Sequence, residues 1–367
     1  MRVLMTGGGT AGHVNPAIAI ANTIKEKQSD AEIAFVCSSQ KSDKATLLVP
    51  HAGYGEPYRV DICGRYQLWN PKNIKTLYLM IKSRAQARRI INEFKPDVII
   101  GTGGFACYPV LRAGAEMGIP TLVHESNAIP GKAVKRLASV IDCVMTNFES
   151  SGLLQGAKRV VTVGNPNVIK SSDSKTQGGA RKVLIFGGSR GAQMLNSDVV
   201  SMLADIADKY PDVEFCHGCG SVDFDRMTEE YARLGLDGKP NVKLIEYIYD
   251  MSERMNAATV VISRAGAMTI SELALCQKAA IIVPSPNVAD NHQYKNAKAL
   301  ADKGACVMVQ ETQYGTGALT SELCRLLDNS DARAELEKNI KSFAVSDANE
   351  VIYAEIMRTV KEKSSKK

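Results

Sequence analysis

The sequence predicts an α/β protein of two similar domains, each built on a parallel sheet. Its 367 residues exceed the length that one hydrophobic core usually organises. Strand-like apolar runs alternate with helix-like stretches, which is typical of parallel sheets covered by helices on both faces. A strand, a glycine loop and a long helix begin the chain and recur at residue 182, so the second half repeats the first.

The first half opens with a strand at 2–6, the glycine loop 7–12 and a helix to about residue 26. Further strands are expected at 32–37, 58–62, 97–100 and 121–124, and further helices at about 73–94, after Pro109 and from Pro130. In such sheets ligands bind beyond the carboxyl ends of the strands. Three polar or glycine-rich loops stand there, at 7–13, 101–104 and 124–127.

The first loop fits the G-x-G-x-x-G pattern of dinucleotide-binding domains through Gly7, Gly9 and Gly12. The next strand ends in Ser38-Ser39-Gln40 and offers no acid at its tip to hold an adenosine ribose. This disfavours an NAD-dependent dehydrogenase.

The second half begins after the polar stretch 170–180, with a strand at 182–186 and the glycine loop 187–193. Strands are expected near residues 214, 242, 259, 279 and 306, followed by a last helix at 348–361. A polar loop at 284–296 precedes another helix and is a further candidate for ligand contact.

Residues 262–273 predict a strand, a tight turn and a helix. Gly266 is expected to adopt a conformation that a β-carbon would oppose, which would leave the N–H groups of the helix start pointing at a phosphate. Glu272, one turn into the helix, would repel that phosphate unless it binds a partner such as ribose hydroxyls. These features indicate a sugar-nucleotide site, with an ordinary strand-to-helix turn as the alternative.

The composition excludes several classes of protein. A net charge of +6 is too small to require nucleic acid. No apolar run approaches the ~18 residues needed to cross a bilayer, and residues 3–5 are too short for a signal peptide, so a cytoplasmic protein is expected. The 9 cysteines lack a disulfide framework, and Cys216-His-Gly-Cys219 is interpreted as the end of a strand rather than as a zinc or redox site.

Short motifs stand in a fixed order along both halves: Gly-Gly-Gly-Thr-Ala-Gly-His-Val at 7–14, Gly-Thr-Gly-Gly at 101–104, His-Glu-Ser-Asn at 124–127, Val-Gly-Asn-Pro at 163–166, Gly-Gly-Ser-Arg-Gly-Ala at 187–192, Ser-Arg-Ala-Gly-Ala at 263–267 and Asp-Asn-His-Gln at 290–293. As an ordered set they resemble the MurG family of peptidoglycan glycosyltransferases. Members of this family add N-acetylglucosamine to lipid-linked N-acetylmuramoyl-pentapeptide.

The resemblance implies the GT-B fold, in which two Rossmann-like domains face a cleft and the last helix crosses back to the first domain. Residues 1–163 with 341–367 would form the acceptor- and membrane-facing domain, and residues 164–340 the UDP-sugar-binding domain. The implied reaction is inverting and uses UDP-N-acetylglucosamine and undecaprenyl-linked muramoyl-pentapeptide, with no cofactor and no metal. Peripheral attachment to the inner face of the cell membrane, and contacts with cell-wall synthesis proteins, are implied as well.

The resemblance also assigns binding residues by motif. The donor-binding residues would be Ser189, Arg190, Gly191, Ala265, Gly266, Ala267, Met268, Thr269, Glu272, Gln293 and Asn296. The acceptor-binding residues would be Thr10, Ala11, Gly12, His13, Gly103, Gly104 and Asn127. Two positions depart from the family: Ala11 replaces a frequent glycine, and His292 replaces a glutamine of some members, which leaves its role open.

The implied reaction needs a general base. His13 is the first candidate because an imidazole titrates near neutral pH and this one lies beside the loop expected to face the acceptor. A hydrogen bond that only holds the loop is the alternative role for His13. Glu125 is the second candidate.

The helix at 74–84, extended by Arg88 and Arg89, mixes apolar and basic residues, which suits a helix lying on an anionic membrane surface. The alternative is a core-facing helix with solvated basic side chains. Two other functions stay open for the whole chain: a UDP-N-acetylglucosamine epimerase, which needs no lipid acceptor, and a non-catalytic nucleotide-binding scaffold.

Overall fold

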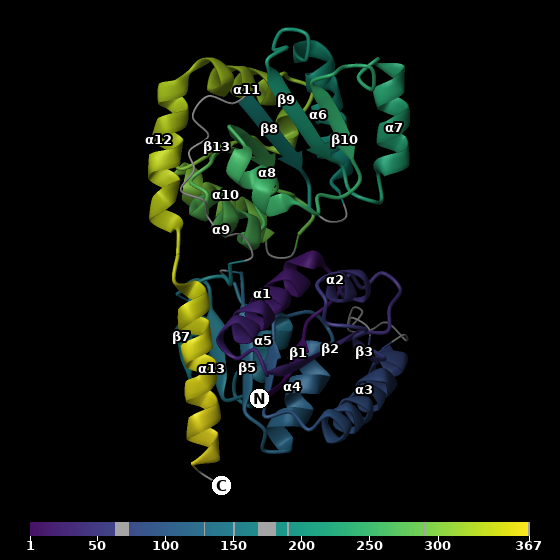
Figure 1. Cartoon of the computed structure of the whole chain (residues 1–367), viewed down its shortest axis with the longest axis vertical. Coiled ribbons are helices and arrows are strands. Elements are labelled where there is room, and N and C mark those ends of the chain that lie inside the picture. The colour runs from purple at the N-terminus through teal and green to yellow at the C-terminus, as the bar shows by residue number, and fades with distance from the viewer. Residues whose placement is uncertain are drawn as a thin grey trace. The chain divides into compact units, whose positions relative to one another are not determined.

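The computed structural model describes residues 1–62, 73–127, 129–149, 151–167, 181–188, 191–288 and 291–365. The chain divides into two compact units (Figure 1), Met1–Val168 with Ser346–Lys367, and Ile169–Val345. The boundaries expected from the sequence were 163/164 and 340/341. Each unit is an α/β domain with a parallel sheet, as predicted.

The first unit contains seven parallel strands in the order β3-β2-β1-β4-β5-β6-β7. The strands are β1 (Arg2–Thr6), β2 (Glu32–Ser38), β3 (Tyr58–Val60), β4 (Val98–Gly101), β5 (Thr121–Glu125), β6 (Cys143–Thr146) and β7 (Val160–Thr162). The helices are α1 (Ala11–Lys27), α2 (Ala45–His51), α3 (Asn73–Phe94), α4 (Cys107–Glu116), α5 (Lys132–Leu137) and α13 (Ala348–Ser364). The sequence did not predict β6, β7 and α2, which are too short to give a clear periodic pattern.

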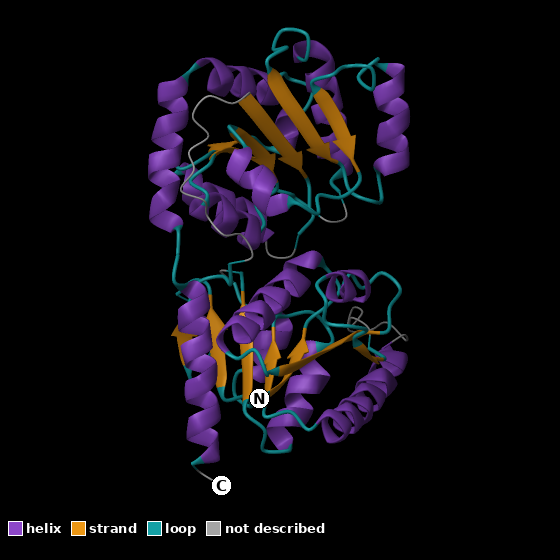
Figure 2. Cartoon of the chain, in the orientation of Figure 1, coloured by secondary structure: helices purple, strands orange, loops and turns teal. Residues whose placement is uncertain are grey.

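The second unit contains six parallel strands in the order β10-β9-β8-β11-β12-β13. The strands are β8 (Arg181–Phe186), β9 (Val213–Gly218), β10 (Val242–Ile245), β11 (Val260–Ser263), β12 (Ala279–Ile282) and β13 (Val307–Met308). The helices are α6 (Gln193–Ile206), α7 (Phe224–Arg233), α8 (Met251–Ala257), α9 (Ala267–Leu275), α10 (His292–Ala301), α11 (Ala318–Asp328) and α12 (Ser330–Ile340). Short 3-10 helices lie at Ser151–Leu153, Glu311–Gln313 and Lys341–Phe343. Figure 2 shows helices on both faces of the strands in each unit.

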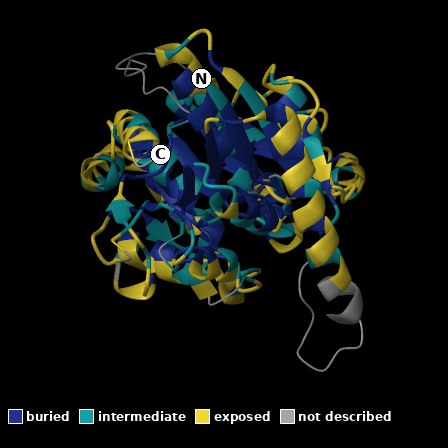
Figure 3. Cartoon of the chain, turned by 90° about the horizontal axis from the view of Figure 1, so that it is seen from below, coloured by how far each residue is buried: buried dark blue, intermediate teal, exposed yellow. Residues whose placement is uncertain are grey.

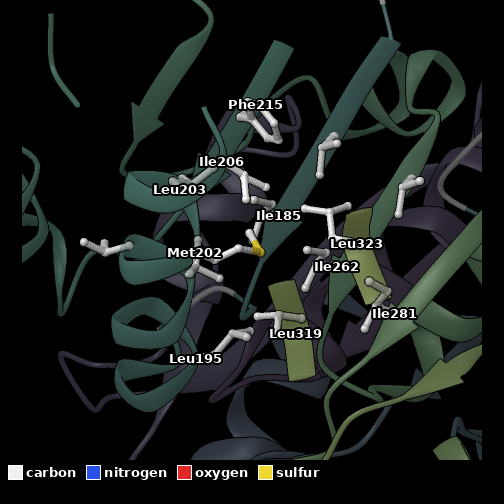
Figure 4. Packing of buried hydrophobic residues seen from close by; sticks show 14 of the residues in the cluster. Ile185, Leu195, Met202, Leu203, Ile206, Phe215, Ile262, Ile281, Leu319 and Leu323 are labelled. Atoms are coloured by element: carbon white, nitrogen blue, oxygen red, sulfur yellow. The ribbon is translucent and has the colours of Figure 1, made fainter. Parts of the chain in front are cut away.

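Alternate residues of the central strands enter different cores, because successive side chains of a strand point to opposite faces. Val183 and Ile185 of β8 pack with α6 and α11, whereas Leu184 and Phe186 pack with α9 and α10. Figure 4 shows Ile185 and Ile262 beside Leu319 in the first of these cores. The central strands β4, β11 and β12 are accordingly buried along their whole length, and the outer faces of the helices are exposed (Figure 3).

The last helix, α13, belongs to the first unit, which confirms the predicted return of the chain. It packs on α1, and Arg159 of the segment before β7 forms an ion pair with the buried Glu355. Lys363 near its end donates to both carboxylate oxygens of Asp142, at 2.7 and 2.8 Å. Charge pairs at both positions therefore fix the helix along the sheet.

The described cysteines are all free thiols, eight in number. Cys216 lies within β9 and Cys219 directly follows it, so the interpretation of this pair as the end of a strand is confirmed. No helix within the described ranges is both long and apolar enough to span a bilayer.

Candidate functional site

In each unit the strand order reverses between two central strands, and ligands of open parallel sheets bind beyond the carboxyl ends of such strands. In the first unit these strands are β1 and β4, which are followed by the loops at Gly7 and Thr102. In the second unit they are β8 and β11, followed by the loops at Gly187 and Arg264. The predicted glycine loops thus occupy the expected ligand-binding edge of each sheet.

The two loops of the first unit approach so closely that only glycine fits. A β-carbon on Gly104 would lie 2.4 Å from the carbonyl oxygen of Gly8, and one on Gly103 would lie 2.5 Å from Nδ1 of His13. Both residues also have positive φ angles, 84° and 106°, which glycine adopts without strain. The predicted acceptor residue Gly103 therefore lies against the His13 ring, and Gly104 lies against Gly8 of the first loop.

Two hydrogen bonds to Thr102 fix His13. Its Nδ1 lies 3.1 Å from the Thr102 carbonyl oxygen, and the Thr102 hydroxyl donates to the His13 carbonyl at 2.6 Å. Because a carbonyl can only accept, the neutral ring carries its proton on Nδ1 and keeps the Nε2 lone pair available. Burial lowers the pKa of His13 below 6.5, although the charge of Glu125 and the Thr102 carbonyl oppose this. The ring is therefore neutral near pH 7.

Asp43 holds the first glycine loop and was not predicted from the sequence. This buried carboxylate accepts hydrogen bonds from the backbone N–H groups of Gly9, Ser38 and Ala45 and from the Ser38 hydroxyl, at 2.7 to 3.0 Å. The signal available was an isolated acid just after a strand end. The Gly9 N–H is consequently unavailable to a ligand.

Glu125 and Asn127 form a second polar loop after β5. One carboxylate oxygen of Glu125 accepts from the backbone and side-chain nitrogens of Asn127, both at 3.0 Å, and the other accepts from the Gly131 N–H at 2.8 Å. His124 is fully buried, and its Nε2 lies 2.8 Å from the Gly164 carbonyl. Glu125 and His124 therefore brace this loop, while Asn127 stays half-exposed.

In the second unit the turn after β8 contains Gly191, which has φ +78°. A β-carbon there would lie 2.1 Å from the carbonyl oxygen of Cys219, so this backbone contact also requires glycine. Ser189 and Arg190, predicted to bind the donor, lie outside the described residues.

The backbone conformation predicted for Gly266 is wrong, while its assignment to the donor site stays a prediction. Its φ of −68° and ψ of 140° are open to any residue, and a β-carbon would make only an ordinary contact at 3.6 Å. Gly266 instead caps α9, so that Ala267, Met268 and Thr269 form the first turn of that helix. The side-chain amide of the buried Asn296 donates to the Ala265 backbone carbonyl at 3.2 Å, and the side-chain Oε1 of Gln293 accepts from the Ser285 N–H at 2.9 Å.

Glu272 lies half-buried on α9, and its carboxylate accepts no hydrogen bond from any residue that the structure describes. Burial raises the pKa of Glu272 to about 7. It differs in this from Asp43 and Glu125, whose carboxylate oxygens accept hydrogen bonds. A half-buried carboxylate without such a pair is suited to bind hydroxyl groups of a ligand.

Comparison with known proteins gives one consistent family. The glycosyltransferase family 28 N-terminal domain matches residues 3–146, and the C-terminal domain of that family matches residues 182–352. The UDP-N-acetylglucosamine–N-acetylmuramyl-(pentapeptide) pyrophosphoryl-undecaprenol N-acetylglucosamine transferase of Acetivibrio thermocellus is 36% identical over 377 residues, covering 100% of both chains. The protein of the same name from Limosilactobacillus fermentum is 34% identical and covers 98% of this chain and 99% of its own.

Solved structures agree with this. The crystal structure of Acinetobacter baumannii MurG matches with a TM-score of 0.70 and 26% identity, over 97% of this chain and 99% of its own. A UDP-GlcNAc 2-epimerase from Neisseria meningitidis matches with a TM-score of 0.66 at 16% identity, over 98% of this chain and 100% of its own, which shows a common fold.

Glu272→Gln should stabilise the protein at high pH. A folded-state pKa raised to about 7 means that the native state keeps a proton which the unfolded chain releases near 4.5, so stability falls as pH rises through this window. Above pH 7 the neutral amide should increase the free energy of unfolding by about 1–3 kcal/mol, with little change at pH 4.5. Urea denaturation at pH 4.5, 6 and 8 measures this. The exposed Glu335→Gln on α12 is the control, and parallel pH dependences in wild type and E272Q would contradict the prediction.

Proposed function

The chain belongs to the family of UDP-N-acetylglucosamine–N-acetylmuramyl-(pentapeptide) pyrophosphoryl-undecaprenol N-acetylglucosamine transferases, and on this premise we propose that it transfers N-acetylglucosamine from UDP to the 4-hydroxyl of lipid-linked N-acetylmuramoyl-pentapeptide. The reaction converts lipid I to lipid II with inversion at the anomeric carbon. It serves peptidoglycan synthesis and hence cell shape and division.

The observation that carries this function is the presence of a glycine-rich ligand-binding edge in each unit, in a chain related to these transferases over its full length. A nucleotide alone would need one such edge. A transfer between two diphosphate-bearing substrates uses both, since each needs its own backbone N–H groups and helix N-terminus.

The donor belongs to the second unit. The ribose hydroxyls donate to Glu272, the diphosphate meets the start of α6 after the glycine turn at Gly191, and the uncharged first turn of α9 lies at the nucleotide. By motif, Ser189 and Arg190 contact the diphosphate and stabilise it as it leaves. Gln293 keeps its amide nitrogen for the donor sugar, whereas Asn296 acts through Ala265, whose carbonyl it binds.

The acceptor belongs to the first unit. Its diphosphate meets the start of α1 at Ala11 and Gly12, because Asp43 already binds the Gly9 N–H. Thr10, Gly103, Gly104 and Asn127 complete the surface around it. The muramoyl 4-hydroxyl then comes within reach of His13.

His13 is the general base. Its Nε2 takes the proton of the 4-hydroxyl while that oxygen attacks the anomeric carbon and the bond to UDP breaks. Support comes from the Nδ1 contact with Thr102, which selects the required tautomer, and from the lowered pKa, which keeps the ring neutral. Glu125 is less suited, since both its oxygens accept N–H bonds, but its charge stabilises the imidazolium that forms.

The enzyme meets its lipid substrate as a peripheral membrane protein through α3. Ser83, Ala87 and Ile91 turn into the core, whereas Tyr78 and Ile81 are 62% and 67% exposed. Leu79 is partly covered, so Ile81 rather than Leu79 is the apolar residue of this helix placed to insert into the membrane. The side chains of residues 73–77 lie outside the described set.

Beside Tyr78 and Ile81, arginine side chains of α3 form ion pairs with one carboxylate of α4. Glu116 of α4 binds Arg84, Arg88 and Arg112, with N to O distances of 2.9 Å for Arg88 and 2.8 Å for Arg112. Burial would raise the pKa of Glu116, but these hydrogen bonds outweigh it and hold the pKa at about 2. Three guanidinium groups around one carboxylate leave an excess of positive charge, which suits anionic lipid.

Acceptor-dependent release of UDP tests the function. With UDP-N-acetylglucosamine and a short-chain lipid-linked acceptor, UDP and a product heavier by one N-acetylglucosamine should form in equal amounts. Without acceptor, the donor should remain unchanged. An epimerase would consume the donor and form its 2-epimer without acceptor, and a scaffold would bind UDP without turnover; either result would contradict the proposal.

His13→Ala should lower turnover by about 10²–10⁴-fold because the general base is lost, while UDP affinity stays unchanged. In the wild type the rate should fall as pH drops through a pKa below 6.5, and this acidic limb should disappear in H13A. Steady-state kinetics between pH 5 and 9 measure it. The exposed His51→Ala, in the same unit, is the control, and an acidic limb that persists in H13A would assign the base elsewhere.

Ile81→Glu should reduce binding to anionic vesicles at both low and high salt, because it removes inserted apolar surface. Replacing Arg84, Arg88 and Arg89 by glutamine should reduce binding at low salt, by about 1 kcal/mol per charge near the surface, and much less at high salt. Vesicle co-sedimentation across a salt series measures both.

Leu153→Glu is the matched control for the membrane experiment. Leu153 is 48% exposed and lies between β6 and β7, at the sheet edge opposite to β3. If I81E and the triple variant sediment like L153E and wild type, another face of this unit meets the lipid.

A further inference from the structure

A chain of buried polar side chains adjoins Gly191 and the start of α6. Asn196 of α6, His217 of β9 and Tyr231 of α7 are 0%, 0% and 2% exposed. His217 Nε2 lies 3.1 Å from the Asn196 side-chain oxygen, and its Nδ1 lies 2.9 Å from the Tyr231 hydroxyl. Three separate elements of the second unit are thereby connected through one imidazole.

Hydrogen-bonding capacity fixes the direction of every bond in this chain. The Asn196 oxygen can only accept, so His217 Nε2 carries the proton and Nδ1 accepts from the Tyr231 hydroxyl. Burial lowers the pKa of His217 to about 3, against the opposing charge of Asp223, so the ring is neutral at physiological pH. The network is thus fully satisfied, which makes it a rigid support.

Asn196 extends the network to the glycine turn. Its amide nitrogen donates to the Cys219 carbonyl at 2.9 Å and to the Asp223 carboxylate at 2.7 Å. The Cys219 carbonyl oxygen is the atom that a β-carbon on Gly191 would meet at 2.1 Å. The backbone of Gly191 therefore rests on a carbonyl group whose position Asn196 fixes.

The same network holds the first turn of α6. Asp223 accepts from Arg226 at 2.7 and 2.8 Å, and Arg226 also donates to the Ser197 hydroxyl at 3.1 Å and to the Gln193 carbonyl at 3.3 Å. Asn196 thus supports Gly191 through Cys219, and Arg226 supports the start of α6.

We propose that Asn196 is a positioning residue for the donor diphosphate: through Cys219 and Asp223 it holds the glycine turn at Gly191 and the start of α6, so that the N–H groups of the first turn of α6 meet the phosphates. The inference rests on the proposed function, which assigns the diphosphate to this turn. Asn196 itself is buried with both polar atoms bonded, so it acts on the ligand only through these backbone groups.

The test compares the affinities of the full chain for UDP and for uridine, measured by titration calorimetry. In wild type UDP should bind more tightly than uridine, because only UDP uses the turn. Asn196→Leu, which keeps the size of the side chain, should lower the affinity for UDP by about tenfold and the affinity for uridine by less than about twofold. Arg226→Gln is a milder variant for the case that N196L does not fold, and it should show the same selective loss.

Arg181→Gln is the matched control. Arg181 also bonds a carboxylate and a backbone carbonyl, Asp212 and Leu327, but lies at the opposite end of β8. It should leave the ratio of UDP to uridine affinity unchanged. If a folded N196L or R226Q variant keeps the wild-type ratio of UDP to uridine affinity, the network only stabilises the core. The same conclusion follows if both affinities fall by the same factor. If wild type binds UDP no better than uridine, the assignment of the diphosphate to this turn fails first.

Discussion

Close approach of backbone to backbone at the carboxyl ends of the central strands is the constraint on which both candidate sites depend. Gly104 lies against the Gly8 carbonyl in the first unit, and Gly191 lies against the Cys219 carbonyl in the second. At these distances any side chain would separate the loops. The N–H groups of each ligand-binding edge can therefore converge only where glycine is present.

Glycine loops have no side chains to bury, so buried polar groups behind them supply their rigidity. Asp43 accepts a hydrogen bond from the first loop, and Glu125 accepts one from the loop after β5. Asn196 donates to the Cys219 carbonyl, against which Gly191 lies. Each of these groups has its hydrogen bonds inside the protein, which stabilises a single loop geometry. Glu272 is different: its carboxylate has no such bond from the described residues, and its raised pKa marks a group that costs stability and is available for a ligand.

The relation between sequence and structure differs from residue to residue. Gly7, Gly103 and Gly191 were recognised because glycine loops after apolar strands leave a clear pattern, and the structure explains them by contacts that exclude a β-carbon. Gly266 was recognised for the wrong reason, since its backbone is ordinary and the helix that it caps is the feature that matters. Asp43 and Asn196 were missed, because an acid in a turn and an asparagine in a helix look like surface residues until their neighbours are known.

The two α/β halves and the strand edges that carry the glycine loops could be predicted from the sequence alone, and the order of the motifs indicated the transferase family. These features follow from hydrophobic periodicity and turn residues, which depend only on residues close together in the sequence. The side chains that hold those loops, and the lack of a hydrogen bond to Glu272 from the described residues, became visible only in the folded chain. The tautomer of His13 depends on Thr102, and the support of Gly191 depends on Cys219 and Asn196. Burial and hydrogen bonding between residues far apart in the chain arise only when the strands are aligned.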